Sequence, residues 1–244
     1  MNFDSRGLLM CARYSFAPNL FHYCGPQKQV NLREYITTGS TDQGLTEILE
    51  QFDTLYKYLE MIALQNKLQD PFAARVVEAY WLGNNLLNKS KFRPFASHLT
   101  DTLQLQKSLP KKHLHRLLEK LDTGVAQHTF HVLNIFRRTG HQAIPHTLST
   151  MDNCRISWGK VKKIKHEEDT AVEILVEVAA LIYEKDKLSL GLPTVKNVLS
   201  LGFSPKLGEW VSIHWGYVCQ VLTGVQVTNL KYYTELAINL ANRQ

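Results

Sequence analysis

The sequence predicts an α+β protein: a mostly α-helical domain over residues 1–148, with an irregular N-terminal segment, precedes a small β-barrel with a C-terminal helix over residues 149–244. From residue 41 to about residue 140, apolar residues recur every three or four positions, as on the buried side of a helix. After Gly140 they alternate with polar residues, as in half-buried strands. Helical spacing returns over residues 223–241 and predicts the final helix.

The helical region begins irregularly. Prolines and glycines interrupt the first 40 residues, which predicts loops there with one short helix. A long amphipathic helix is expected to begin at Thr41 or Asp42, because apolar residues from Leu45 to Ala63 recur at spacings of three and four.

Further helices are predicted before residue 140. Asp70 and Pro71 indicate a helix start, since Asp is a favourable N-cap and Pro is tolerated at the first helical position. This helix is expected to end near Gly83. The others are bounded by Pro or Gly and span residues 94–109, 110–122 and 125–137.

The region after Gly140 contains short strands. Valine and isoleucine alternate there with polar residues, and turn-forming residues separate the runs. The runs lie at 161–164, 172–178 and 211–213, and the turns at 166–169, 184–187 and 205–208. Several short strands followed by one helix predict a small barrel or rolled sheet with a C-terminal helix.

Composition restricts the class of protein. Hydrophobic residues make up 44% of the chain and charged residues 20%, which is typical of soluble globular proteins. The chain lacks an apolar run of about 18 residues and a signal-peptide pattern, so we expect a cytoplasmic protein without a membrane partner. Its four cysteines are widely spaced, which favours reduced thiols. The net charge of +6 comes largely from short basic runs, which favour solvated helix faces over nucleic-acid binding.

Two motifs flank the predicted strands. Positions 154–161 are Cys-Arg-Ile-Ser-Trp-Gly-Lys-Val, and positions 208–218 are Gly-Glu-Trp-Val-Ser-Ile-His-Trp-Gly-Tyr-Val, followed by the final helix. This C-terminal third resembles the HypC/HupF family of hydrogenase maturation chaperones. Members of that family begin with Cys-x-x-x-Pro-Gly-x-Val and later carry Gly-[Asp/Glu/Gln]-[Tyr/Trp]-Val-x-Val-His-x-Gly-[Phe/Tyr] before a C-terminal helix. The N-terminal helical domain has no such resemblance.

The resemblance implies a fold, a function and a site. In that family a small OB-like barrel works with an iron–sulfur partner, HypD, to hold the iron dicyano-carbonyl unit of nickel–iron hydrogenases and hand it over. It implies an OB-like barrel here, an iron unit held by Cys154 and His214, and as partners a HypD-like scaffold and a hydrogenase large subunit. A thiolate and an imidazole are suitable ligands for iron. Alternation along the strand places His214 on the face opposite Val211 and Ile213.

The chain departs from the family pattern at two positions. Family members have their cysteine at position two, so that removal of Met exposes both a thiol and an α-amine, whereas Cys154 is internal and offers only its thiol. Trp158 stands where the family has proline. A module that kept the fold but changed its ligand is therefore an alternative.

Other residues are candidates for chemistry. Cys24 lies at a Cys-Gly-Pro turn close to His22, where exposure and backbone amides can lower the pKa of a thiol. His128 and His131 are three residues apart, so they share one face of a helix, a spacing that suits a metal ion.

Three functions remain open at this stage. The first is a metal carrier. It is favoured over an enzyme because the sequence contains no phosphate-binding loop, nucleophile elbow, His-Glu-x-x-His or Cys-x-x-Cys motif. The second is a non-catalytic OB-like interaction module that binds protein or nucleic acid. The third is a cysteine-dependent enzyme that uses Cys24 as nucleophile and His128 or His131 as base.

Overall fold

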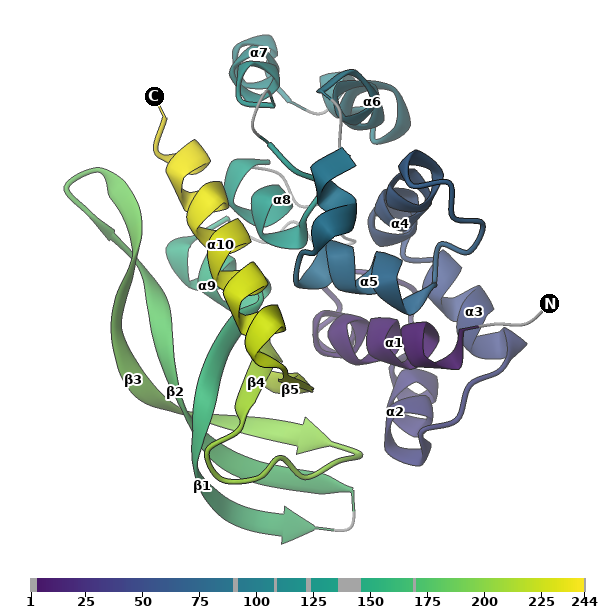
Figure 1. Ribbon diagram of the computed structural model, residues 1–244, viewed down its shortest axis with the longest axis vertical. Helices are drawn as coiled ribbons and strands as arrows, with labels where there is room; N and C mark the ends of the chain where they lie inside the picture. The colour runs from purple at the N-terminus through teal and green to yellow at the C-terminus, as the bar shows by residue number, and fades with distance from the viewer. Residues whose placement is uncertain are drawn as a thin grey trace.

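The computed structural model describes residues 4–89, 92–107, 109–121, 124–135, 146–168 and 170–243. Helices make up the N-terminal part, and a closed five-stranded barrel and a last helix follow (Figure 1). The helices are α1 (Ser5–Leu20), α2 (Gln29–Thr38), α3 (Gln43–Glu50), α4 (Asp53–Gln65), α5 (Ala74–Trp81), α6 (Phe92–Ser97), α7 (Lys111–Glu119), α8 (His128–Asn134), α9 (Leu148–Cys154) and α10 (Gly224–Ala241). The strands are β1 (Ser157–Glu168), β2 (Ala171–Glu184), β3 (Lys187–Leu201), β4 (Trp210–His214) and β5 (Tyr217–Leu222). The mixed α and β class is therefore confirmed.

The first 40 residues form two helices, so the prediction of irregular structure there is wrong. Asp4 caps α1, because its carboxylate accepts hydrogen bonds from the backbone N–H groups of Arg6 and Gly7. Pro18 lies in the last turn of α1, where its missing N–H removes a hydrogen bond just before the helix ends. Most of α1 is buried in the core, and this burial stabilises the helix despite the proline inside it.

The expected long helix is two helices, α3 and α4. Its predicted start is correct, since the Asp42 carboxylate accepts a hydrogen bond of 2.9 Å from the N–H of Leu45. The chain breaks at Phe52, whose ring is buried against Gly25. Gly25 has a positive φ of 80°, and a Cβ there would lie 2.2 Å from the Phe52 ring. Phe52 is the residue directly before α4 and separates it from α3.

The later helices are shorter than predicted. The helix predicted to start at Asp70 and Pro71 is α5, which begins only at Ala74, so the predicted start is wrong: Asp70 instead accepts a hydrogen bond from the N–H of Phe72 in a turn before the helix. The helix ends close to Gly83 as expected. The segment predicted as one helix over 94–109 is α6 followed by a π turn (His98–Thr102) and a 3-10 turn (Leu105–Lys107), and another 3-10 turn (Asn85–Lys89) follows α5. The end of the helix predicted over 125–137 lies partly outside the described residues.

The barrel closes in the strand order β1-β2-β3-β5-β4, with β1 antiparallel to both β2 and β4. Strands β3 and β5 pair in parallel. The predicted alternation holds for β2 and β4 and for Val161 of β1, whose side chains fill the interior, but not for Ile164, which is exposed after a register shift in β1. The buried core of the barrel is Val161, Val172, Ile174, Val176, Val178, Val198, Val211, Ile213 and Val218.

The barrel and the helices share a second, larger hydrophobic core. This core runs from α1, α4, α5 and α8 through α10 to the outer faces of β2, β3 and β5. Figure 1 shows α10 lying between the long β2–β3 hairpin and the helical part. The Asn242 side chain fixes the hairpin by bonding the backbone N–H and carbonyl of Leu188, both at 2.8 Å. Within the described ranges, no helix has the length and apolar character needed to cross a membrane.

Candidate metal-binding cavity

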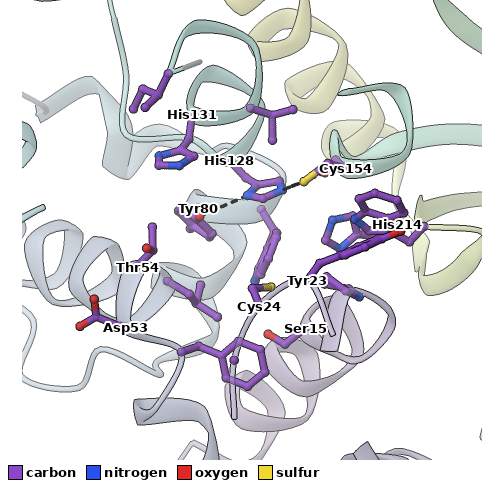
Figure 2. Close-up of a pocket in the computed structure, with 18 of the residues that line it drawn as sticks. Ser15, Tyr23, Cys24, Asp53, Thr54, Tyr80, His128, His131, Cys154 and His214 are labelled. Atoms are coloured by element: carbon purple, nitrogen blue, oxygen red, sulfur yellow. Dashed lines mark hydrogen bonds between the residues drawn. The ribbon is translucent and has the colours of Figure 1, made fainter. Parts of the chain in front are cut away.

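A cavity of about 290 Å³ lies where the helical part meets the barrel (Figure 2). Its walls come from α1, the loop after α1, the start of α4, the end of α5, α8, the end of α9 and β4. Most of the wall is aromatic or aliphatic, and thiols and imidazoles supply its reactive groups. The residues with polar or aromatic side chains that line it include Ser15, Tyr23, Cys24, Asp53, Thr54, Tyr80, Trp81, His128, His131, His146, Cys154, His214 and Trp215.

His128, Cys154 and His214 converge at one end of this cavity. Their ligand atoms, one from each side chain, all lie within 4.8 Å of one another. They come from α8, the last residue of α9 and the last residue of β4. Residues that are far apart in the sequence thus form a compact set of one sulfur and two nitrogen donors.

His214 owes its position to a tight hairpin and to a proline in α1. It ends β4 directly before the turn residues Trp215 and Gly216, which both have positive φ. Its Nδ1 lies 2.7 Å from the carbonyl oxygen of Tyr14, and because a carbonyl only accepts, Nδ1 carries the proton. Pro18 has no N–H for that carbonyl four residues earlier, so the carbonyl is available to His214. Nε2 of the neutral ring then carries the lone pair that a metal ion requires.

His128 is held between Tyr80 and Cys154 (Figure 2). Its Nε2 lies 2.8 Å from the backbone carbonyl oxygen of Cys154, so Nε2 donates in this arrangement. Its Nδ1 lies 3.1 Å from the Tyr80 hydroxyl, which donates to it. Burial raises the pKa of Tyr80 well above its ordinary value, so the hydroxyl keeps its proton. Both ring nitrogens therefore have defined partners in a buried site.

Cys154 is fixed by the residues on either side of it. Its Sγ lies 3.9 Å from Nε2 of His128. The neighbouring Arg155 is 1% exposed, and its guanidinium bonds the Asp152 carboxylate at 2.8 Å and the carbonyl of Ala179 at 2.6 Å. The carbonyl of Asn153 accepts a hydrogen bond from the N–H of Trp215. The end of α9 is thereby attached to both β2 and the β4–β5 turn.

The other candidate residues lie in different places. Cys24 and His131 line the same cavity but are outside the three-residue cluster. His131 bonds the Tyr58 hydroxyl at 3.0 Å, and burial lowers its pKa to about 4, so it is neutral. His22 is exposed, bonds Gln29 at 3.0 Å and is not part of the cavity wall. The spacing of His128 and His131 brings both to the cavity, yet each bonds a different tyrosine.

The remaining cysteines are buried thiols away from the cluster. Burial raises the pKa of Cys11 to about 12 and raises that of Cys219 as well, so both stay protonated. Neither lines the cavity. The structure thereby separates Cys154 and Cys24, at the cavity, from two cysteines that serve in packing.

Sequence reasoning missed the residues that orient the cluster. Tyr80 and the Tyr14 carbonyl hold the two imidazoles, and Trp81 packs against both rings at centroid distances of 4.5 and 5.5 Å. No short sequence motif contains these residues, because each lies on a different element from the histidine that it contacts. Pro18 was the one available signal, since a proline inside a helix leaves a carbonyl unbonded four residues earlier.

The cluster has the chemistry of a transition-metal site. Thiolate and imidazole together suit zinc, iron, cobalt and copper, whereas magnesium and calcium require oxygen ligands. Three protein donors beside a cavity leave room for further ligands on a metal, as in catalytic or transport sites. Orientation of ligand imidazoles by carbonyl and hydroxyl groups is also typical of metal sites.

A comparison with protein families finds one match, to the model described as "Family of unknown function (DUF6390)", over residues 3–244. This match covers the helices and the barrel together, and it includes all three residues of the cluster. Neither a curated protein nor a solved structure matches the chain.

Proposed function

The chain belongs to the DUF6390 family, and we propose that it is an accessory metallochaperone that carries a small iron unit through Cys154 and His214. By resemblance, the cargo is the iron dicyano-carbonyl unit used in nickel–iron hydrogenase maturation. The observation that carries the proposal is the convergence of the Cys154 and His214 donor atoms within 4.8 Å at the edge of a cavity. The resemblance implies that these two residues hold one iron unit, and their proximity supports this.

The barrel supports the same proposal. It is closed and five-stranded, as in an OB-like fold, and Cys154 precedes its first strand while His214 ends its fourth. The cavity of about 290 Å³ has space for a metal ion with small ligands. The proposal places the protein in the cytoplasm, where thiols stay reduced.

The proposed partners follow from the cargo. A HypD-like iron–sulfur scaffold would supply the iron unit, and a hydrogenase large subunit would receive it. The helical part then forms the second wall of the binding cavity, because α1, α5 and α8 face the barrel residues across it.

Infrared spectroscopy tests this function. The protein is purified anaerobically after co-expression with a HypD-like partner, and the cyanide and carbonyl stretching region is recorded. We expect bands in the wild type, their loss in Cys154→Ala and in His214→Ala, and their retention in Cys24→Ala, which changes a thiol in the same cavity outside the cluster. Absence of bands in the wild type, with the partner present and folded, contradicts the proposal.

Cysteine-dependent catalysis by Cys154 is a second candidate. Its Sγ lies 3.9 Å from Nε2 of His128, whose Nδ1 bonds the Tyr80 hydroxyl. In the tautomer with the proton on Nδ1, which the Tyr80 hydroxyl can accept, Nε2 carries no proton and serves as the base for the Cys154 thiol. An acyl adduct on Cys154 after treatment with an activated ester, detected by mass spectrometry and lost in His128→Gln, supports this function. Equal labelling of the wild type and the variant argues against it. The version that uses Cys24 as nucleophile stays a prediction.

A further inference from the structure

We infer that His128 is a third protein ligand of the metal cargo, contributed by the helical part to a site whose other donors flank the barrel. This inference rests on the proposed metal-binding function. It assigns the site one thiolate and two imidazoles, a donor set for a transition metal such as iron, cobalt or zinc.

The distances favour a shared ligand set. A tetrahedral metal ion with bonds of about 2.3 Å to sulfur and about 2.0 Å to nitrogen holds these two donors about 3.5 Å apart. The observed separation of Cys154 Sγ and His128 Nε2 is 3.9 Å, and all donor pairs of the cluster lie within 4.8 Å. Side-chain movements on the scale of one ångström therefore bring the three donors onto one ion.

The hydrogen bonds of His128 allow its Nε2 to bind a metal ion and to release it again. Nε2 now donates to the Cys154 carbonyl, and Nδ1 accepts from the Tyr80 hydroxyl. Ligation through Nε2 requires the ring proton to reside on Nδ1, so one proton leaves Nε2 and one is gained at Nδ1. The Tyr80 hydroxyl is both a donor and an acceptor, so it then accepts from Nδ1 and orients the ring in either state.

Burial makes His128 a precise ligand. Its side chain is 8% exposed, and its ring packs against Trp81 at 4.5 Å and against His214 at 5.3 Å. α8 itself is packed on α10 and α5. A ligand on such a rigid element loses little freedom when it binds, which favours affinity.

The alternative is a purely structural His128, which anchors the end of α9 through the Cys154 carbonyl. The two roles differ in what they predict for a metal-loaded protein. A ligand contributes a second imidazole to the coordination shell, whereas an anchor leaves the shell with one.

Cobalt binding to the full chain under anaerobic conditions tests the inference. We expect the wild type to bind one Co²⁺ with a thiolate-to-cobalt charge-transfer band, and His128→Gln to keep this band while binding at least about tenfold more weakly. The matched control is His131→Gln, on the same helix and the same cavity but outside the cluster, with unchanged affinity. Circular dichroism of the metal-free proteins establishes that each variant is folded.

X-ray absorption spectroscopy of the zinc-loaded wild type gives a readout that needs no variant. One sulfur and two imidazoles in the shell support the inference, and one imidazole overturns it. If the wild type binds metal and His128→Gln binds equally well, the inference fails while Cys154 and His214 remain a carrier site. If the wild type shows no thiolate charge-transfer band, both the proposed metal function and the third ligand are contradicted.

Discussion

At the residue scale, the orientation of His214 depends on an atom that Pro18 does not have. A residue with a backbone N–H at position 18 would donate to the Tyr14 carbonyl, as in a regular helix, and compete with His214 Nδ1 for it. Pro18→Ala is therefore expected to weaken Co²⁺ binding about tenfold, as second-shell changes do, without unfolding the protein. Pro193→Ala, on the exposed part of β3, is the control. Equal affinities of the wild type and Pro18→Ala would show that the proline does not orient the imidazole.

Two buried histidines near the cavity predict how stability depends on pH. Burial lowers the pKa of His98 and of His131 to about 4, and neighbouring groups add to this: Lys57 for His98, and His98 and His146 for His131. An unfolded histidine titrates near about 6.5. Between these values the unfolded chain binds protons that the folded chain excludes, so stability is full above about pH 6.5 and falls as the pH is lowered toward 4.

The expected slope is up to about 1.4 kcal/mol per pH unit for each histidine. Urea denaturation between pH 4.5 and 7 measures it. His98→Gln removes one of the two groups and should flatten the profile. A pH-independent free energy of unfolding in the wild type would show that these imidazoles are not buried in neutral form.

At the scale of elements, the short helix α9 is positioned by an ion pair. Burial favours the neutral form of Asp152, but Arg155, the Leu181 N–H and Lys196 outweigh it and hold the pKa of this carboxyl below its ordinary value. Asp152→Asn leaves the Arg155 charge buried without its partner, which is expected to cost about 3–5 kcal/mol.

Chemical denaturation of Asp152→Asn measures this cost. In the double variant Asp152→Asn with Arg155→Met, no buried charge remains without a partner, because Lys196 reaches solvent, so it should be more stable than the single variant. Metal affinity should fall in Asp152→Asn as well, because α9 ends at Cys154. A single variant as stable as the wild type would mean that Asp152 does not hold this helix.

The same scale shows which elements sequence patterns predict. The start of α3 at Asp42, the end of α5 near Gly83 and the helix α10 are correct, because caps and apolar spacing act within a few residues. α1 is missed because Gly7 and Pro18 lie inside it and because it is buried on most sides, so its apolar residues do not form a single stripe at helical spacing. The break at Phe52 is missed because the apolar spacing from Leu45 to Ala63 continues through it.

At the scale of the whole molecule, the sequence predicts individual residues of the candidate site but not how they are arranged in space. Cys154 and His214 were identified by their motifs, and His128 was a candidate through its spacing to His131. That His128 lies with Cys154 and His214 rather than forming a pair with His131 follows from how α8 packs beside α9 and the barrel. A one-dimensional pattern contains no information on such packing. The tyrosines that orient the imidazoles carry no motif for the same reason.

A metal ion with donors on both sides of the cavity should stabilise the molecule as a whole. His128 belongs to the helical part, His214 to the barrel and Cys154 to the helix between them, so a bound ion links all three in the folded state. Zn²⁺ at 100 times its dissociation constant adds about 2.7 kcal/mol, which for a chain of this size raises the melting temperature by about 5–10 °C. Calorimetry measures this shift.

At the same zinc concentration the shift should be smaller in His128→Gln and absent in Cys154→Ala, while His131→Gln should match the wild type. A zinc-induced shift that persists in Cys154→Ala would place the ion elsewhere in the protein.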